Sequence, residues 1–275
     1  MSSYYRIADH IINIINNGNK LSTLSLLPSF VPFKCDNLLN EKILFKLTID
    51  QSVTLIESDK VHHIRAFDTG NGDTVVDRLD NGGYQFLIKN IQGENCVLLI
   101  TNKDFSDCRC RLYGTDNMQR FGLNNALMLV MAFAGCSNDT ILVHASLVRH
   151  NNYGYAFIAK SGTGKSTQVS LWLKYIPNCD LMNDDNPVIR LIDNIPYIYG
   201  SPWSGKTPCY RNVKAPLGAI TRIDRAKTNS VDKLSPIESF ASVLPSCSSM
   251  KWDKDIYNNI CNIVTKIIER ISIYT

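Results

Sequence analysis

The sequence predicts an α/β protein of mixed α+β type, in which a smaller β-rich module of residues 1–115 precedes a second domain of residues 116–275. Two observations predict this division. In the first part, short apolar runs alternate with clusters of Asn, Gly and Asp, the usual pattern of strands joined by tight turns. In the second part, a long helical pattern starts at Asp116, and strand-like runs then alternate with further helical patterns.

Length, charge and cysteine usage exclude several protein classes. The chain has 275 residues, enough for one large domain or two small ones, and its 44% hydrophobic content excludes global disorder. A net charge of +4 is too mild to indicate a nucleic-acid partner. No apolar run approaches the ~18–20 residues of a membrane span, and the N-terminus lacks the layout of a secretory signal. Nine scattered cysteines favour a reduced compartment, so we expect a cytoplasmic protein with no membrane partner.

The first part is predicted to be a mostly antiparallel β module. Its strand-like runs are Ile43–Ile49, Val53–Glu57, Tyr84–Lys89 and Cys96–Thr101. Turn-forming clusters at 68–73 (DTGNGD) and 80–83 (DNGG) lie between such runs. A strand followed by a Gly-rich turn is the signature of a hairpin.

The second part begins with a predicted helix over 116–135, so the domain boundary should lie near 115–138. A later helix should start at the capping box Ser235-Pro236-Ile237-Glu238. A last helix should start near Asp253, and its isoleucine stripe indicates either core or the face of a homo-oligomer. Further elements are predicted as strands at 140–149, 153–159, 181–182, 187–192, 197–199 and 217–223, and as a helix at 166–176.

The strongest motif is AKSGTGKST, residues 159–167, between a predicted strand and a predicted helix. Gly162 and Gly164 allow backbone conformations that point successive N–H groups at an anion, and the helix N-terminus adds partial positive charge. Lys165 can reach outer phosphates, and the Ser166 hydroxyl can ligate Mg²⁺. Ala159 replaces the first glycine of the general pattern but leaves the cradle and the lysine intact. The predicted nucleotide-binding residues are Ser161, Gly162, Thr163, Gly164, Lys165, Ser166 and Thr167.

Two adjacent carboxylates, Asp184 and Asp185, follow a short apolar segment. Phosphoryl transfer needs one carboxylate near Mg²⁺ and another group to orient or deprotonate the nucleophile. The alternative is a solvated Asx-type turn before Pro187. Asp184 follows Lys165 by only 19 positions, which leaves room for one helix and a direct return to a neighbouring strand. This spacing favours a compact kinase over a GTPase or an ATPase motor.

These motifs together resemble the catalytic domain of HPr serine kinase/phosphorylase and its relative, ATP-dependent phosphoenolpyruvate carboxykinase. The resemblance spans about 138–270 and rests on HASLV at 144–148, on the phosphate loop and on NDDNPVI at 183–189. It implies a phosphoenolpyruvate carboxykinase-like fold. It also implies that Asp184 is the base toward an acceptor hydroxyl, that Asp185 and Ser166 lie on the metal side, and that His144 assists. The alternative for His144 is a core histidine within an apolar strand.

The first part is similar to the N-terminal module of small HPr-kinase-like proteins from peptide natural-product cassettes, through YRIA at 5–8 and SFVPF at 29–33. Relatives of that kind phosphorylate a serine of a precursor peptide. The chain is far shorter than the carboxykinases, which argues against the carboxykinase reaction.

A second loop, residues 199–211 (YGSPWSGKTPCYR), combines turn formers, aromatic residues and two cations. It lacks the leading glycine of a phosphate loop, and Pro208 prevents a helix from starting there. We expect it to close on the site, where Lys206 and Arg211 would neutralise charge on the transferred phosphoryl group and Trp203 would exclude water. The alternative is a surface loop with solvated cations.

The sequence therefore predicts a kinase that uses ATP and Mg²⁺ to phosphorylate a hydroxyl, most specifically a serine of a peptide or small-protein partner. A non-catalytic ATP-binding scaffold and a kinase of free serine or a sugar are the alternatives. The predicted catalytic residues are Asp184, His144, Lys165, Lys206 and Arg211.

Overall fold

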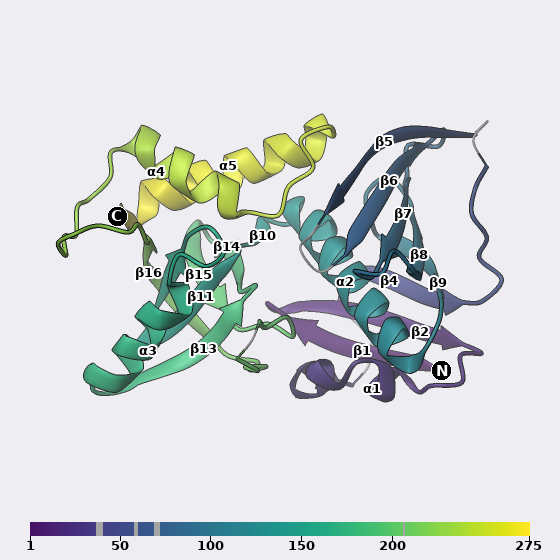
Figure 1. The fold of residues 1–275 in the computed structure, drawn as a ribbon, viewed down its shortest axis with the longest axis horizontal. Helices are drawn as coiled ribbons and strands as arrows, with labels where there is room; N and C mark the ends of the chain where they lie inside the picture. Colours follow the sequence, from purple (N-terminus) through teal and green to yellow (C-terminus); the bar gives the residue numbers. More distant parts are fainter. Residues whose placement is uncertain (37–40, 58–59, 69–71, 206) are drawn as a thin grey trace. The chain divides into compact units, whose positions relative to one another are not determined.

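The structure is a computed structural model that describes the whole chain except residues 37–40, 58–59, 69–71 and 206. The chain forms two compact units, Met1–Ala134 and Gly135–Thr275 (Figure 1). The sequence predicts the division between residues 115 and 116, with a boundary range of 115–138, and the observed division after Ala134 lies within that range. In the part of the chain that the structure describes, there are two mixed β-sheets and few helices, which confirms the mixed α/β class.

The first unit contains a mixed sheet, for which the described residues give nine strands in the order β3-β1-β2-β4-β9-β8-β7-β6-β5. Strand β4 pairs in parallel with β2 and β9, and the other pairings are antiparallel, as the turn clusters predicted. The strands are β1 (Ser2–Ile7), β2 (His10–Asn17), β3 (Lys34–Cys35), β4 (Ile43–Asp50), β5 (Val61–Asp68), β6 (Asp73–Leu79), β7 (Tyr84–Lys89), β8 (Asn95–Thr101) and β9 (Asp107–Leu112).

One predicted strand of the first unit is wrong. Residues Val53–Glu57 are irregular, because the N–H of Ile56 bonds the side chain of Gln85 instead of a neighbouring strand. The first unit also holds the short helices α1 (Thr23–Leu26) and η1 (Pro28–Phe33).

Helix α2 (Asp116–Cys136) confirms the predicted helix and packs on the sheet of the first unit. Gly122 lies so close to strand β8 that a Cβ atom there would be 2.8 Å from the backbone of Cys96. The ring of Phe133 contacts that of Phe105, with ring centroids 5.4 Å apart. Most of this helix is therefore core of the first unit, which explains why the two units divide only in its last turn.

The second unit is built on another mixed sheet, for which the described residues give the order β10-β14-β15-β16-β12-β11-β13, with β17 beside β16. Strands β12 and β16 are parallel, so their carboxyl ends lie at one edge. The strands are β10 (Thr140–Leu142), β11 (Ala145–His150), β12 (Tyr153–Ile158), β13 (Cys179–Asp185), β14 (Val188–Ile192), β15 (Ile195–Tyr199), β16 (Lys214–Arg222) and β17 (Ser272–Tyr274).

The segment expected as a single strand over 140–149 is divided at residues 143–144. Strand β10 pairs with β14, whereas β11 pairs with β12 and β13. Between them, the N–H of Val143 bonds the carbonyl of Pro187, and the N–H of His144 bonds that of Ser246 at 2.7 Å. His144 therefore lies in a junction and not within an apolar strand.

Three longer helices complete the second unit: α3 (Lys165–Tyr175), α4 (Pro236–Val243) and α5 (Lys254–Arg270), with η3 (Leu244–Ser246) after α4. Figure 1 shows α4 beside α5 and, apart from them, α3 against β11 and β13. The capping box at Ser235 and the N-cap at Asp253 are confirmed. The stripe on α5 is core, because Ile256, Ile260 and Ile267 are buried. In the described part of the chain, no helix has both the length and the apolar character of a membrane span.

Candidate active site

The phosphate loop runs from the end of β12 to the first turn of α3. Gly162 and Gly164 have φ values of +76° and +123°, a region in which a side chain is strained, and no atom lies within 4 Å of where their Cβ atoms would be. Gly164 is the N-cap of α3, so no cap side chain bonds the N–H groups of the first turn. Ala159 is outside the positive-φ region, so its Cβ atom causes no such strain. The loop thus has the backbone conformation that its glycines predicted.

Lys165 is held at the base of this loop by two acceptors. Its Nζ atom lies 2.9 Å from Nε2 of His144 and 3.2 Å from the carbonyl oxygen of Ala159. Burial lowers the pKa of Lys165 below its ordinary value, and the nearby carboxylates of Asp185 and Asp184 oppose that shift. The carboxylates therefore do not fully offset the cost of burying the Lys165 charge, and this lysine can still attract an anion.

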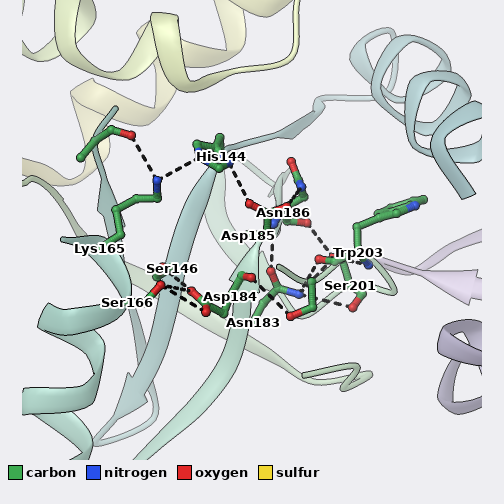
Figure 2. A network of polar contacts seen from close by, with 12 residues as sticks. His144, Ser146, Lys165, Ser166, Asn183, Asp184, Asp185, Asn186, Ser201 and Trp203 are labelled. Atoms are coloured by element: carbon green, nitrogen blue, oxygen red, sulfur yellow. Dashed lines mark hydrogen bonds and ion pairs between the residues drawn. The ribbon is translucent and has the colours of Figure 1, made fainter. Parts of the chain in front are cut away.

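His144 links Lys165 to Asp185. Its Nδ1 atom lies 3.0 Å from Oδ1 of Asp185, on the ring edge opposite the contact with Lys165. An ammonium group can only donate, so Nε2 accepts from Lys165 while Nδ1 carries the proton that bonds Asp185. Figure 2 shows the three side chains in this sequence. The side chains of His144 and Asp185 are 43% and 34% exposed, so both are accessible from solvent.

Asp184 has a different environment, although it is the next residue. It is buried, with 6% of its surface exposed, and it accepts hydrogen bonds from two hydroxyls. Ser146 on β11 donates to Oδ1 at 2.5 Å, and Ser166 on α3 lies 3.2 and 3.3 Å from Oδ1 and Oδ2 (Figure 2). The carboxylate pair is therefore not a solvated turn, because one member is joined to the phosphate-loop serine and the other to His144.

The second loop packs against the carboxylate pair through a buried amide. Nδ2 of Asn183 donates to the carbonyl oxygens of Ser201 and Trp203 and to the Ser201 hydroxyl, at 3.1–3.3 Å. The Ser201 hydroxyl in turn donates to the carbonyl of Asn186 at 2.6 Å. The N–H of Gly205 bonds the carbonyl of Asp184 at 2.5 Å. The loop thus lies beside Asp184 and Asp185, as expected, with Trp203 buried inside it.

Of the two cations predicted in this loop, Arg211 does not join the site. Arg211 donates to Oδ2 of Asp180 at 2.6 Å and to the carbonyl of Leu181, at the opposite end of β13 from the carboxylate pair. Asp180 also receives both arms of Arg149, at 2.9 and 3.0 Å. Arg211 therefore neutralises Asp180 and occupies a carbonyl of the β13 edge. Lys206 lies outside the described residues.

Three residues of the site were not predicted from the sequence. Ser146 is the single polar residue of the buried apolar run at 145–148, which is a usable signal. Asn183 directly precedes the carboxylate pair, but its partners in the second loop are remote in sequence. Arg225 donates to the carbonyl of Gly162 at 2.8 Å. It reaches the phosphate loop because β16 runs parallel to β12, a pairing that no local pattern indicates.

The oxygen donors at the loop suit a magnesium ion. The hydroxyl of Ser166 and the carboxylate of Asp184 are hard ligands of the kind that Mg²⁺ prefers. Over the described ranges, no group of three or more His, Cys, Asp and Glu side chains could hold a metal ion. Protein sites for Mg²⁺ commonly supply only one or two carboxylates and leave the remaining positions to phosphates and water. Two donors beside a phosphate loop therefore fit this ion.

Comparison with known proteins assigns no family to the chain. No protein-family model matches it, and no curated protein gives a significant match. The resemblance of residues 138–270 to HPr kinases therefore remains a prediction. Any functional assignment depends on the side chains described above.

Proposed function

We propose that the protein is an ATP- and Mg²⁺-dependent kinase that phosphorylates a hydroxyl, specifically a serine of a peptide or small protein. We further propose that residues 135–275 have the HPr kinase and phosphoenolpyruvate carboxykinase type of fold. The observation that carries the proposal is the bond between Ser166 and Asp184. It joins the phosphate loop to the carboxylate pair, so a bound phosphate chain and a reacting hydroxyl would meet at one place.

In this proposal, the phosphate loop binds the β- and γ-phosphates of ATP. Its backbone N–H groups and the N-terminus of α3 supply donors and partial positive charge. Lys165 supplies a full charge, and a polyphosphate would compete with His144 and Ala159 for its Nζ atom. Arg225 adds a second cation at the loop, since its contact with the Gly162 carbonyl uses only one of its five N–H donors.

Ser166 and Asp184 would hold Mg²⁺, which supplies charge neutralisation at the phosphates when it is bound. The Ser166 hydroxyl donates its proton to Asp184, so its lone pairs remain available for a cation. This assignment exchanges the two roles that the resemblance implied. Asp184 is bonded to the metal-side serine, whereas Asp185 is bonded to His144 and is accessible from solvent.

Asp185 is accordingly the proposed proton acceptor. As the acceptor oxygen forms its bond to the γ-phosphorus and the bond to the leaving β-phosphate oxygen breaks, the hydroxyl proton passes to the Asp185 carboxylate. His144 donates its Nδ1–H to that carboxylate and so holds it in one orientation toward the acceptor hydroxyl. Both side chains are more than a third exposed, which suits a hydroxyl carried by a peptide better than a small molecule that needs enclosure.

The test combines nucleotide binding with transfer from γ-labelled ATP. Wild-type protein should bind ATP with Mg²⁺ by calorimetry and should label serine peptides, and Lys165→Met should lose both activities. A matched Lys174→Met variant, at the far end of the same helix, should keep both. Tight ATP binding without transfer to peptides, free serine or sugars would favour the scaffold alternative. Absence of nucleotide binding would refute the phosphate-loop assignment itself.

A further inference from the structure

Ser146 is a buried hydroxyl near the start of β11, in the apolar part of that strand. It is 1% exposed, and its neighbours Ala145, Leu147 and Val148 are completely buried. It lies directly opposite Asp184 in the antiparallel register of β11 and β13. Residues opposite each other in such a pair project to the same face, which brings the Ser146 hydroxyl within 2.5 Å of Oδ1 of Asp184. The bond is therefore specified by strand register and does not depend on a flexible loop.

We propose that Ser146 is a positioning residue for the metal site: its hydroxyl fixes the carboxylate of Asp184, which in turn orients the Ser166 hydroxyl toward Mg²⁺. The inference rests on the proposed function and deepens it, because it names a residue that tunes the metal site without touching the metal. Asp184 accepts from Ser146 on one strand and from Ser166 on α3, so the three side chains form one continuous chain of hydrogen bonds.

The energetics favour a specific role over simple strand filling. A buried hydroxyl is costly unless it is bonded, and valine would suit a buried strand better than serine. Without Ser146, Oδ1 of Asp184 would keep only the longer bond from Ser166, and the carboxylate could rotate about its Cβ–Cγ bond. Removing a hydrogen-bond partner of a metal-binding carboxylate commonly lowers metal affinity by about 10–100-fold.

The experiment measures Mn²⁺ as a spin probe for Mg²⁺, by electron paramagnetic resonance, in the presence of a non-hydrolysable ATP analogue. Ser146→Ala should weaken Mn²⁺ binding by about 10–100-fold, while the affinity for the analogue without metal stays within about twofold. Ser146→Thr keeps the hydroxyl and should restore most of the Mn²⁺ affinity. Ser170→Ala is the matched control, since the Ser170 hydroxyl bonds the carbonyl of Ser166 and not Asp184.

Ser146→Cys provides a second variant of similar volume, in case alanine prevents folding. A thiol is a weak donor, so this variant should also weaken Mn²⁺ binding. Mn²⁺ affinity within about twofold of wild type in the folded Ala or Cys variant, with only a lower melting temperature, would show that Ser146 is structural and would overturn the inference. Failure of wild-type protein to bind the analogue at all would instead refute the proposed function.

Discussion

Substituting each carboxylate of the pair separately tests how they divide the chemistry. Asp184→Asn retains the shape of the buried side chain but removes the charge that accepts from Ser146 and Ser166. A hydrogen bond to a charged group contributes ~1.5–3 kcal/mol, against ~0.5–1.5 for a neutral one. Each bond thus loses about 1 kcal/mol, and the two together reduce the free energy of unfolding by about 2 kcal/mol. Metal affinity should fall with it by at least the ~10–100-fold that loss of an outer-shell partner causes, because Asp184 is the proposed ligand itself.

Asp185→Asn should give the opposite pattern. Its side chain is 34% exposed and it is bonded to His144 at the solvent-accessible side of the site, so the stability change should stay below about 1 kcal/mol. Mn²⁺ affinity should remain close to wild type. Phosphoryl transfer should fall by about 10²–10⁴-fold, the usual contribution of a general base. Each variant replaces one carboxylate oxygen by an amide nitrogen, and the two sites are adjacent in the chain, so the variants serve as controls for one another.

Three measurements distinguish the variants: urea denaturation, Mn²⁺ binding with an ATP analogue, and single-turnover transfer at increasing Mg²⁺. High Mg²⁺ should partly restore Asp184→Asn, because its defect lies in metal affinity, and should not restore Asp185→Asn. The reasoning is refuted if Asp185→Asn loses metal affinity while Asp184→Asn retains it. That result would reinstate Asp184 as the base and Asp185 as the metal ligand, as the resemblance to HPr kinases implied.

Three further predictions concern charges near the site. Arg211→Met should lower the free energy of unfolding by about 1 kcal/mol with unchanged nucleotide affinity; weaker nucleotide binding would restore the predicted role of Arg211 at the phosphates. Burial tends to raise the pKa of Asp180, but Arg149 and Arg211 outweigh it and lower that pKa. The stabilisation of the folded state by the ionised Asp180 is therefore complete above the unfolded pKa of about 3.9, and it is lost as pH falls through the lower folded pKa. The free energies of unfolding of wild type and Asp180→Asn should accordingly converge in acid. Burial lowers the pKa of Lys165. Lys165→Met should therefore raise the free energy of unfolding at pH 7, and this gain should vanish above about pH 10.4, where the lysine is neutral in both states. A lower free energy of unfolding of this variant at pH 7 would contradict the prediction.

Local chemistry made part of the fold and site predictable. The glycines of the phosphate loop, the capping box at Ser235 and the N-cap at Asp253 each act within a few residues, and each has the expected geometry. The 19-residue spacing from Lys165 likewise predicted that the paired aspartates return beside the phosphate loop, where Ser166 bonds Asp184. Signals of this kind do not depend on how distant segments pair.

Features that depend on strand pairing could not be predicted. The division of the 140–149 segment arises because β10 and β11 pair with different strands, and only this division frees His144 for Lys165 and Asp185. The sequence predicts Arg211 at the phosphates only because it is a cation in a loop near the motif. In the structure Arg211 instead forms an ion pair with Asp180 at the far end of β13. Arg225 was missed for the same reason, since its proximity to the loop follows from the parallel pairing of β16 with β12.

The same pairing explains how two neighbouring carboxylates can serve different tasks. Successive residues of a strand project to opposite faces of the sheet, so Asp184 and Asp185 are separated as far as adjacent side chains can be. The register that sets Ser146 opposite Asp184 directs that carboxylate toward the face covered by α3, where Ser166 lies. Asp185 then turns toward the junction that holds His144. A shift of one residue in the β11–β13 register would exchange these environments. The assignment of metal ligand and base therefore depends on strand register, which the sequence of the Asp pair alone does not specify.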